Sequence, residues 1–343
     1  MRLITYIIFI SLFVSCVKDK PNPVTQNPVS MGAGHKVYIC NEGNFGSSNS
    51  SVSLFDLENN SVVSDLYKTQ NNNAVLGDVC QSILKLNNRF YIVVNNSGKI
   101  VVVNADDFKF ETAITGLNSP RYVLPVSPNK AYVSDLYANS VSIIDLNTQT
   151  KTGSIACGGW TEQMALIYNK AFVTNMNRDY CYVVNTINDQ ITDSILTGPN
   201  AGSIVIDKNS KVWILSSGKT SSNTLAKLTR INPVTMQTEI TYTFNTGDAP
   251  NNLCMNAAKD KLYFLKGNVY SMNITDATLP STYIINGNGH TFYGLSINPL
   301  NNDIYVSDAI DYVQKSSVMI YSSKAQLKQS FKAGINASYF WFD

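Results

Sequence analysis

One four-residue pattern recurs along this chain of 343 residues, and it limits the possible folds more than any other feature. The pattern is an apolar residue, an aromatic residue, a second apolar residue, and then a small or apolar residue. Short runs of this kind are typical of buried β-strands. Seven copies occur, at Val37–Cys40, Phe90–Val93, Ala131–Ser134, Ala171–Thr174, Val212–Leu215, Leu262–Leu265 and Ile304–Ser307.

The spacing of these tetrads predicts an all-β fold, a seven-bladed β-propeller over residues 37–343. Successive aromatic positions are 53, 41, 40, 41, 50 and 42 residues apart. A step near 40 residues is the length of one propeller blade of four strands with their turns. The two longer steps coincide with polar segments at 41–51, 69–79 and 216–224, which we interpret as loop insertions. No segment keeps a helical period, so we expect few helices.

The two ends of the repeat region predict how the ring closes. The first unit begins directly with its tetrad and lacks the strand that precedes the tetrad elsewhere, such as 82–86 or 202–206. The chain ends with one strand left over, Ala337–Asp343. We expect this C-terminal strand to join the first blade, because a closed ring leaves no unpaired sheet edge between the first and last blades.

The first 36 residues have the pattern of an export signal and a tether. Arg2 precedes an apolar run from 3 to 14, whose twelve residues would rise about 18 Å as a helix, too short for a bilayer core of about 30 Å. We therefore interpret residues 1–15 as a cleaved signal peptide. Leu12–Cys16 looks like a bacterial lipobox with Cys16 as the lipidated residue, although an ordinary secretory signal remains an alternative. Residues 16–36, rich in Pro, Asn, Ser and Gly, indicate a flexible tether.

Composition argues against several classes of function. A net charge of +2 provides no basic face for nucleic acid. The two histidines, His35 and His290, are too few for a histidine metal site, and no common catalytic motif is present. Asp135, Asp308 and Asp311 lack the spacing of a calcium loop, which favours solvated turns. We therefore predict no enzyme activity, no bound metal and no cofactor.

The scattered cysteines predict free thiols rather than a disulfide framework. Five remain after Cys16, and they show neither CxxC spacing nor an even count. Their apolar surroundings favour buried thiols, with a single bridge left open. These residues are Cys40, Cys80, Cys157, Cys181 and Cys254.

The loops that follow each tetrad, and those that lead into the next blade, should share one face of the propeller. They combine aromatic rings with Asn, Gly and Ser, a composition suited to adaptable recognition. Other roles stay open: Trp160 and Phe45 could pack inward as loop anchors, Arg121 could bridge carbonyls between blades, and Tyr137, Arg178 and Tyr312 could be ordinary surface residues. The candidate ligand-binding residues are Asn41, Glu42, Phe45, Arg121, Tyr137, Trp160, Arg178, His290, Tyr293 and Tyr312.

The lipobox, the charged Lys18-Asp19 that follows it and the segment Val37–Gly46 together resemble the YncE-like surface lipoproteins of gut Bacteroidetes, and among them the cobalamin-capturing members. The resemblance covers essentially the whole mature chain. It implies a lipid-anchored protein of the outer-membrane surface that captures a corrinoid and passes it to a TonB-dependent transporter, the cobalt arriving inside the ligand. Two other classes remain open: a scaffold for protein or glycan interaction, and a propeller lactonase or lyase.

Overall fold

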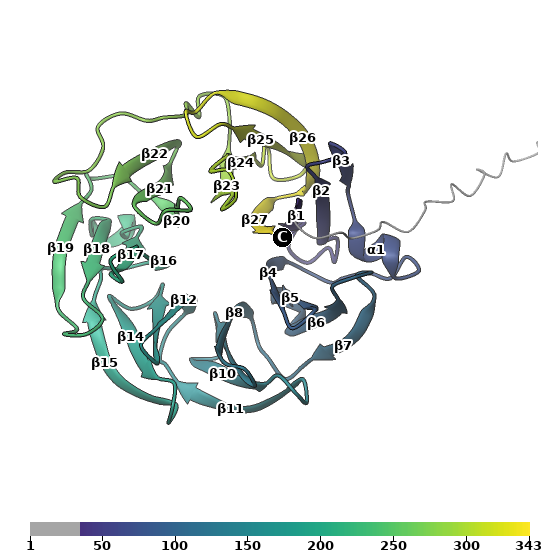
Figure 1. Cartoon of the computed structure of the whole chain (residues 1–343). Coiled ribbons are helices and arrows are strands. Elements are labelled where there is room, and N and C mark those ends of the chain that lie inside the picture. The colour runs from purple at the N-terminus through teal and green to yellow at the C-terminus, as the bar shows by residue number, and fades with distance from the viewer. Residues whose placement is uncertain (1–34) are drawn as a thin grey trace, which may run out of the picture.

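Each tetrad occupies the second strand of a β-sheet, and seven such sheets form a closed ring (Figure 1). The computed structural model describes residues 35–343. The prediction of an all-β, seven-bladed propeller is confirmed. The predicted signal peptide, Cys16 and nearly all of the predicted tether lie outside the described residues. The first strand begins at Lys36, one residue before the expected boundary.

Blades one to four are antiparallel four-stranded sheets, each numbered here from its innermost strand outward. Blade one contains β27 (Ala337–Phe342), β1 (Lys36–Asn41), β2 (Ser51–Asp56) and β3 (Ser61–Val63); blade two contains β4 (Cys80–Leu86), β5 (Arg89–Val94), β6 (Lys99–Asn104) and β7 (Phe110–Ile114); blade three contains β8 (Pro120–Ser127), β9 (Lys130–Asp135), β10 (Ser140–Asp145) and β11 (Thr150–Ala156); blade four contains β12 (Thr161–Ile167), β13 (Lys170–Asn175), β14 (Tyr180–Asn185) and β15 (Gln190–Leu196).

Blades five and seven repeat this plan, whereas blade six has three strands. The expected fourth strand is replaced by the segment between Asn273 and Phe292, which touches β22 through one bridge, Val269 to Ile285. Blade five contains β16 (Ala201–Ile206), β17 (Val212–Ser216), β18 (Lys227–Ile231) and β19 (Thr238–Thr243); blade six contains β20 (Asn251–Met255), β21 (Lys261–Lys266) and β22 (Asn268–Asn273); blade seven contains β23 (Phe292–Ile297), β24 (Ile304–Asp308), β25 (Lys315–Tyr321) and β26 (Leu327–Ile335).

The tetrads are buried because neighbouring blades stack on both faces of each sheet, which explains their continuous apolar character. Between blades one and two, for example, Tyr38 lies against Phe90 with ring centroids 4.4 Å apart, and Phe108 completes the cluster. The seven innermost strands surround the axis of the ring (Figure 1).

The C-terminal strand closes the ring as expected. β27 pairs antiparallel with β1, from Val37 opposite Phe342 to Asn41 opposite Ala337. Phe340 is buried beside Tyr305 of blade seven. The last carboxylate side chain, Asp343, forms an ion pair of 2.6 Å with Lys85 of blade two.

Helices are few and short in the described chain, as predicted. The α-helix α1 (Leu66–Gln70) follows β3, and two 3-10 turns lie at Asn95–Ser97 and Thr220–Ser222. None of these helices has the length and apolarity that a membrane span requires. All five cysteines within residues 35–343 are free thiols, and burial raises the pKa of the Cys157 thiol to about 12.

Candidate functional site

The innermost strand of every blade carries a β-bulge near its first residue. The pairing register shifts there in each sheet, so one or two residues per blade leave the ladder. Bulges re-aim side chains and are common beside functional sites. The bulged residues are Gln81, Arg121 and Tyr122, Glu162 and Gln163, Gly202, Asn252 and Leu253, Tyr293 and Gly294, and Ser338.

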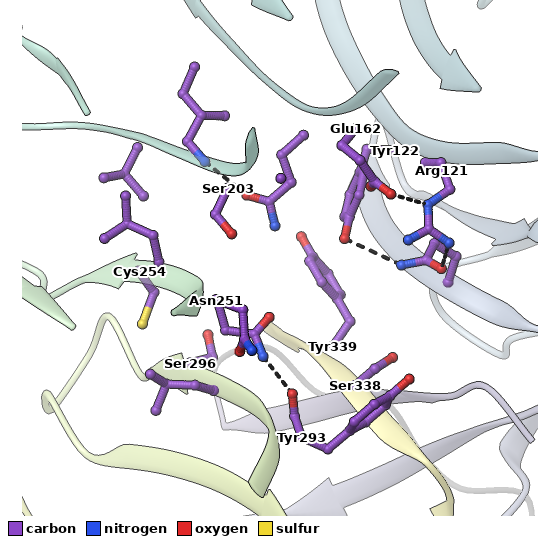
Figure 2. Close-up of a pocket in the computed structure, with 18 of the residues that line it drawn as sticks. Arg121, Tyr122, Glu162, Ser203, Asn251, Cys254, Tyr293, Ser296, Ser338 and Tyr339 are labelled. Atoms are coloured by element: carbon purple, nitrogen blue, oxygen red, sulfur yellow. Dashed lines mark hydrogen bonds and ion pairs between the residues drawn. The ribbon is translucent and has the colours of Figure 1, made fainter. Parts of the chain in front are cut away.

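All of these bulged residues except Gly294 line one cavity of about 680 Å³ on the axis of the ring (Figure 2). This volume lies within the range of sites for small molecules, roughly 300–1,000 Å³. Residues of the loops that follow the second strands, Met176, Ser217 and Tyr312, also line it. One end of the cavity, which we call its mouth, therefore lies on the face formed by those loops, the loop face.

The axial cavity contains a buried ion pair between Arg121 and Glu162. The Arg121 Nε donates to Glu162 Oε1 at 2.8 Å, and its Nη1 donates to the side-chain oxygen of Gln81. The Gln81 amide in turn donates to the Tyr122 hydroxyl at 3.3 Å. These residues belong to blades two, three and four, so the network joins three successive blades at the axis.

Burial shapes the protonation of this network. It raises the pKa of Glu162, and the nearby Arg121 guanidinium only partly opposes that rise. Burial alone would lower the pKa of Arg121, but the Glu162 carboxylate and other neighbours raise it overall. Burial also raises the pKa of Tyr122 to about 12, so this phenol stays a hydrogen-bond donor at neutral pH.

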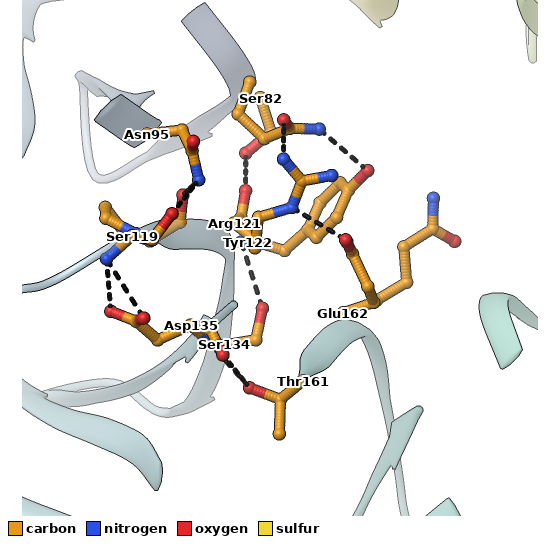
Figure 3. A network of polar contacts seen from close by, with 12 residues as sticks. Ser82, Asn95, Ser119, Arg121, Tyr122, Ser134, Asp135, Thr161 and Glu162 are labelled. Carbon is orange, nitrogen blue, oxygen red and sulfur yellow. Dashed lines mark hydrogen bonds and ion pairs between the residues drawn. The ribbon is translucent and has the colours of Figure 1, made fainter. Parts of the chain in front are cut away.

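A second layer of polar contacts fixes the bulge that presents Arg121 and Tyr122 (Figure 3). The Ser82 hydroxyl donates to the Arg121 carbonyl at 2.7 Å, and the Tyr122 amide donates to the Ser134 hydroxyl at 3.1 Å. The Asn95 side chain donates to the Pro120 carbonyl at 3.0 Å. These three hydrogen bonds fix the backbone of the bulge at residues 120–122, so Arg121 is held in place before any ligand arrives.

Asp135 anchors the entrance to the same strand, and here the expectation of a solvated turn is wrong. Its carboxylate is buried and accepts the backbone amides of Ser119, Tyr137 and Ala138 at 2.9–3.0 Å. The Thr161 hydroxyl joins the Asp135 backbone to blade four. Asp135 lies inside because it ends the second strand, where its short side chain reaches the unpaired amides of its own following loop and of Ser119, just before β8.

Glu42 and Tyr293 form the other charged corner of the axial cavity. The Tyr293 hydroxyl donates to Glu42 Oε2 at 2.6 Å, and the Tyr312 ring meets the Tyr293 ring edge-on at 5.8 Å between centroids. Burial raises the pKa of Glu42, with the Tyr293 hydrogen bond and the more distant Arg121 opposing the shift. A cavity with these groups can hydrogen-bond and orient a ligand.

The lining changes from polar to apolar along the axis. Most innermost strands start at the loop face with a bulge that carries a polar side chain, and all of them except β4 continue with apolar residues that also line the cavity, including Val123, Met164, Val205 and Met255. A ligand entering from the loop face therefore meets hydrogen-bonding groups first and apolar surface beneath them.

Four of the ten predicted ligand-binding residues line the axial cavity: Glu42, Arg121, Tyr293 and Tyr312. Asn41 does not. Its side chain is fully buried, donates to Ser51 and Ser53, and accepts the Gly334 amide at 2.9 Å, so it joins blade one to blade seven.

Three predicted aromatic residues are exposed in the loops of the loop face. Tyr137 and Trp160 are 56% and 40% exposed, and their rings meet edge-on at 5.8 Å. The Trp160 carbonyl accepts the amide of Met176, a cavity residue, at 2.8 Å. Phe45 is 79% exposed, so the inward alternatives for Trp160 and Phe45 do not describe their positions.

The last two predicted residues lie on the loop face outside the cavity. Arg178 is exposed. The His290 Nδ1 lies 2.8 Å from the Asp308 carboxylate, and the His290 ring stacks on Phe292 at 5.4 Å. Burial alone would raise the pKa of Asp308, but hydrogen bonds from His290 and from backbone amides lower it. Asp308 is buried, so the expectation of a solvated turn is also wrong here.

Sequence reasoning missed most of the cavity wall. Many of the missed residues that carry hydrogen-bonding groups lie near the start of an innermost strand, and aligning the seven repeats at that position would have revealed them. Within residues 35–343, no three His, Cys, Asp or Glu side chains lie close enough to hold a metal ion. The missed residues near a strand start include Gln81, Tyr122, Glu162, Gln163, Asn251, Asn252, Ser338 and Tyr339.

Residues 35–343 match a protein family, DUF5074, which is described as a domain of unknown function. No curated protein matches. A quinonprotein alcohol dehydrogenase-like protein from Bacteroides thetaiotaomicron has a similar structure, with 14% identity, a TM-score of 0.71, and coverage of 90% of this chain and 78% of that one.

The periplasmic gluconolactonase of Pseudomonas aeruginosa is also similar, with 10% identity, a TM-score of 0.67, and coverage of 90% of this chain and 98% of that one. At such identities these two likenesses show a shared fold alone.

Proposed function

The chain belongs to the DUF5074 family, and we propose that it is a capture protein that binds a small molecule in the axial cavity and releases it unchanged. The observation that carries this proposal is the ring of bulges: every blade contributes to one pre-formed cavity whose entrance is lined by hydrogen-bonding side chains. A pre-formed cavity in which polar groups converge beside apolar surface is typical of a small-molecule site. A scaffold that binds proteins would more commonly use a flat surface.

The exposed aromatic residues extend this site beyond the cavity. Tyr137 and Trp160 stand over blades three and four, while Phe45 and Tyr312 stand over blades one and seven, across the ring. The Asn44 side chain ties these last two loops together by donating to the Tyr312 carbonyl at 2.8 Å. Rings on opposite sides of the mouth suit a broad, flat ligand that is wider than the cavity itself.

A corrinoid has this shape, with a rim of amide side chains around a flat macrocycle. We propose that it seats part of its rim in the axial cavity, where Gln163 and Asn252 offer matching amides, and rests the macrocycle against the aromatic residues. Anchored through Cys16 at the outer-membrane surface, the protein would pass the corrinoid to a TonB-dependent transporter.

Calorimetric titration with cyanocobalamin tests the ligand. We expect saturable heat at micromolar protein and a change in the visible absorbance of the corrinoid. Ile187→Ala, on the opposite face and 76% exposed, is the control and should bind as the unaltered chain does. Absence of both heat and absorbance change would refute the corrinoid, and turnover of lactone substrates would point to an enzyme instead.

The anchor has a test of its own. Cys16→Ala should move the protein from the membrane fraction to the soluble fraction of expressing cells, because two or more lipid chains are needed for stable attachment. Retention of that variant in the membrane fraction would contradict lipidation at Cys16.

A further inference from the structure

We propose that Glu42 sets the charge preference of the axial cavity, which selects ligands that bring a positive charge or clustered N–H donors and disfavours anionic ligands. This inference rests on the proposed function in one respect, that the ligand enters the axial cavity. It adds a specificity-determining residue and a chemical class of ligand.

The charges that line the cavity do not balance. They are carried by Glu42, Arg121 and Glu162. The Arg121 guanidinium is engaged by the Glu162 carboxylate at 2.8 Å and by Gln81 (Figure 2). Glu42 forms no ion pair within residues 35–343, and the groups that hydrogen-bond to it are neutral hydroxyls, that of Tyr293 at 2.6 Å and that of Ser338. With both glutamates ionised, the cavity holds one net negative charge.

An unpaired carboxylate in this position is costly to the protein alone. Removing a charge from water without a counter-charge is unfavourable, and burial accordingly raises the pKa of Glu42. A ligand that places an ammonium, or several N–H groups, against Glu42 offsets this cost. Uncompensated groups of this kind are concentrated at binding and catalytic sites, where the ligand completes the pairing.

Arg121 does not offer the opposite preference to an anionic ligand. Glu162 is nearly inaccessible, its side chain 4% exposed, and the ion pair is its compensation. The guanidinium keeps further N–H donors, but an anion that drew Arg121 toward itself would weaken the ion pair on which the buried Glu162 carboxylate depends. Anionic groups therefore meet the net negative field of the cavity, and cationic groups are drawn toward Glu42.

Three hexoses that share a pyranose ring and differ in charge provide the test: glucosamine, glucose and glucuronate. Each is mixed at millimolar concentration with the full chain at neutral pH, and binding is read by saturation-transfer NMR. We expect glucosamine to bind about tenfold better than glucuronate, with glucose between them, since a nearby unit charge is strongly felt in a partly buried site. E42Q should reduce this difference several-fold. E58Q, the same substitution at an exposed carboxylate, should preserve it.

Two results would overturn the inference: glucosamine binding no better than glucuronate, or a preference that E42Q leaves unchanged. The outcome of the cyanocobalamin titration is independent of the hexose test. A chain that ignores cyanocobalamin but prefers glucosamine loses the proposed ligand and keeps the charge selectivity. A chain that binds cyanocobalamin without any hexose preference keeps the ligand and loses the role of Glu42.

Discussion

Deleting the closing strand, residues 337–343, should abolish folding of the whole ring. The strand carries four consecutive aromatic side chains, of which Phe340 is buried and Tyr339, Trp341 and Phe342 are half-buried. Its removal also exposes one edge of β1, which then lacks a partner. The deletion therefore destabilises the first and last blades together, because β27 pairs with β1 and packs against blade seven.

The size of the effect follows from these burials. Phe→Ala at a buried site costs about 3–5 kcal/mol. Full burial of a large apolar side chain contributes about 1.5–3 kcal/mol, so three half-buried aromatic residues add roughly 2–5 kcal/mol. The total, about 5–10 kcal/mol, is comparable to the whole stability of a typical domain, about 5–15 kcal/mol.

Circular dichroism and size-exclusion chromatography measure the outcome. The deletion variant should lack a cooperative melt and elute as aggregate. The milder F340A should fold but melt at least about 6 °C lower, at about 2–4 °C per kcal/mol for domains approaching this size. L327A, at a position 58% exposed on β26, should melt within about 2 °C of the unaltered chain. A deletion variant that melted like the full chain would refute the account of closure.

Four other substitutions test the cavity and its surroundings. R121M should cost about 3–5 kcal/mol in urea denaturation because it leaves Glu162 buried without a partner, and R121M/E162M should recover much of this loss; equal stability of all three proteins would contradict the buried pair. W160A should weaken cyanocobalamin binding by about tenfold or more in calorimetry while the melting temperature stays unchanged, since this ring is exposed at the mouth; unaltered affinity would remove Trp160 from the site. Folding raises the pKa of the Glu42 carboxyl, so its ionisation lowers the stability of the folded chain, and E42Q should be more stable than the unaltered chain at neutral pH, by about 1.4 kcal/mol per pH unit of the rise. This advantage should vanish below the ordinary carboxyl pKa of about 4.3, where Glu42 is protonated in both states. An advantage that stayed constant across a pH series of denaturation curves would contradict this cause. G294A should cost about 1–3 kcal/mol in the same measurement, because a Cβ there would lie 2.7 Å from the Ser338 carbonyl oxygen of the closing strand, and a neutral effect would mean that β23 and β27 separate easily.

The fold could be predicted from the sequence because its determinants are local and repeated. Each tetrad is a short run of residues whose burial needs no knowledge of distant partners, and seven copies fix both blade number and blade length. Closure was equally accessible, since a missing strand at one end and a spare strand at the other leave a single way to complete the ring. The absence of a fourth strand in blade six could not be predicted, because the segment between β22 and β23 preserves the repeat spacing although it does not pair as a strand.

The candidate site was predicted only in part, for reasons of register. Glu42 and Tyr293 could be predicted because each lies within a few residues of a conspicuous aromatic side chain in a loop. Gln81 and Glu162 could not, since a single polar residue near the start of a strand has no pattern of its own, and the bulge that turns it toward the axis depends on pairing with the next strand. Asn41 shows the converse: a polar residue at the start of a loop can remain inside when backbone groups of a neighbouring blade require it.

The backbones of Lys36 and Asp343 exchange two hydrogen bonds, of 3.2 and 2.9 Å, at the end of the ring opposite the cavity mouth. Both ends of the described chain therefore leave from the far side of the propeller. A bead, a fusion partner or a sensor surface joined through either end would leave the mouth facing open solution. The same nearness means that a short linker could join the ends and new ends could be cut at an exposed far-side turn such as Tyr168–Asn169, giving a circular permutant with the same blades.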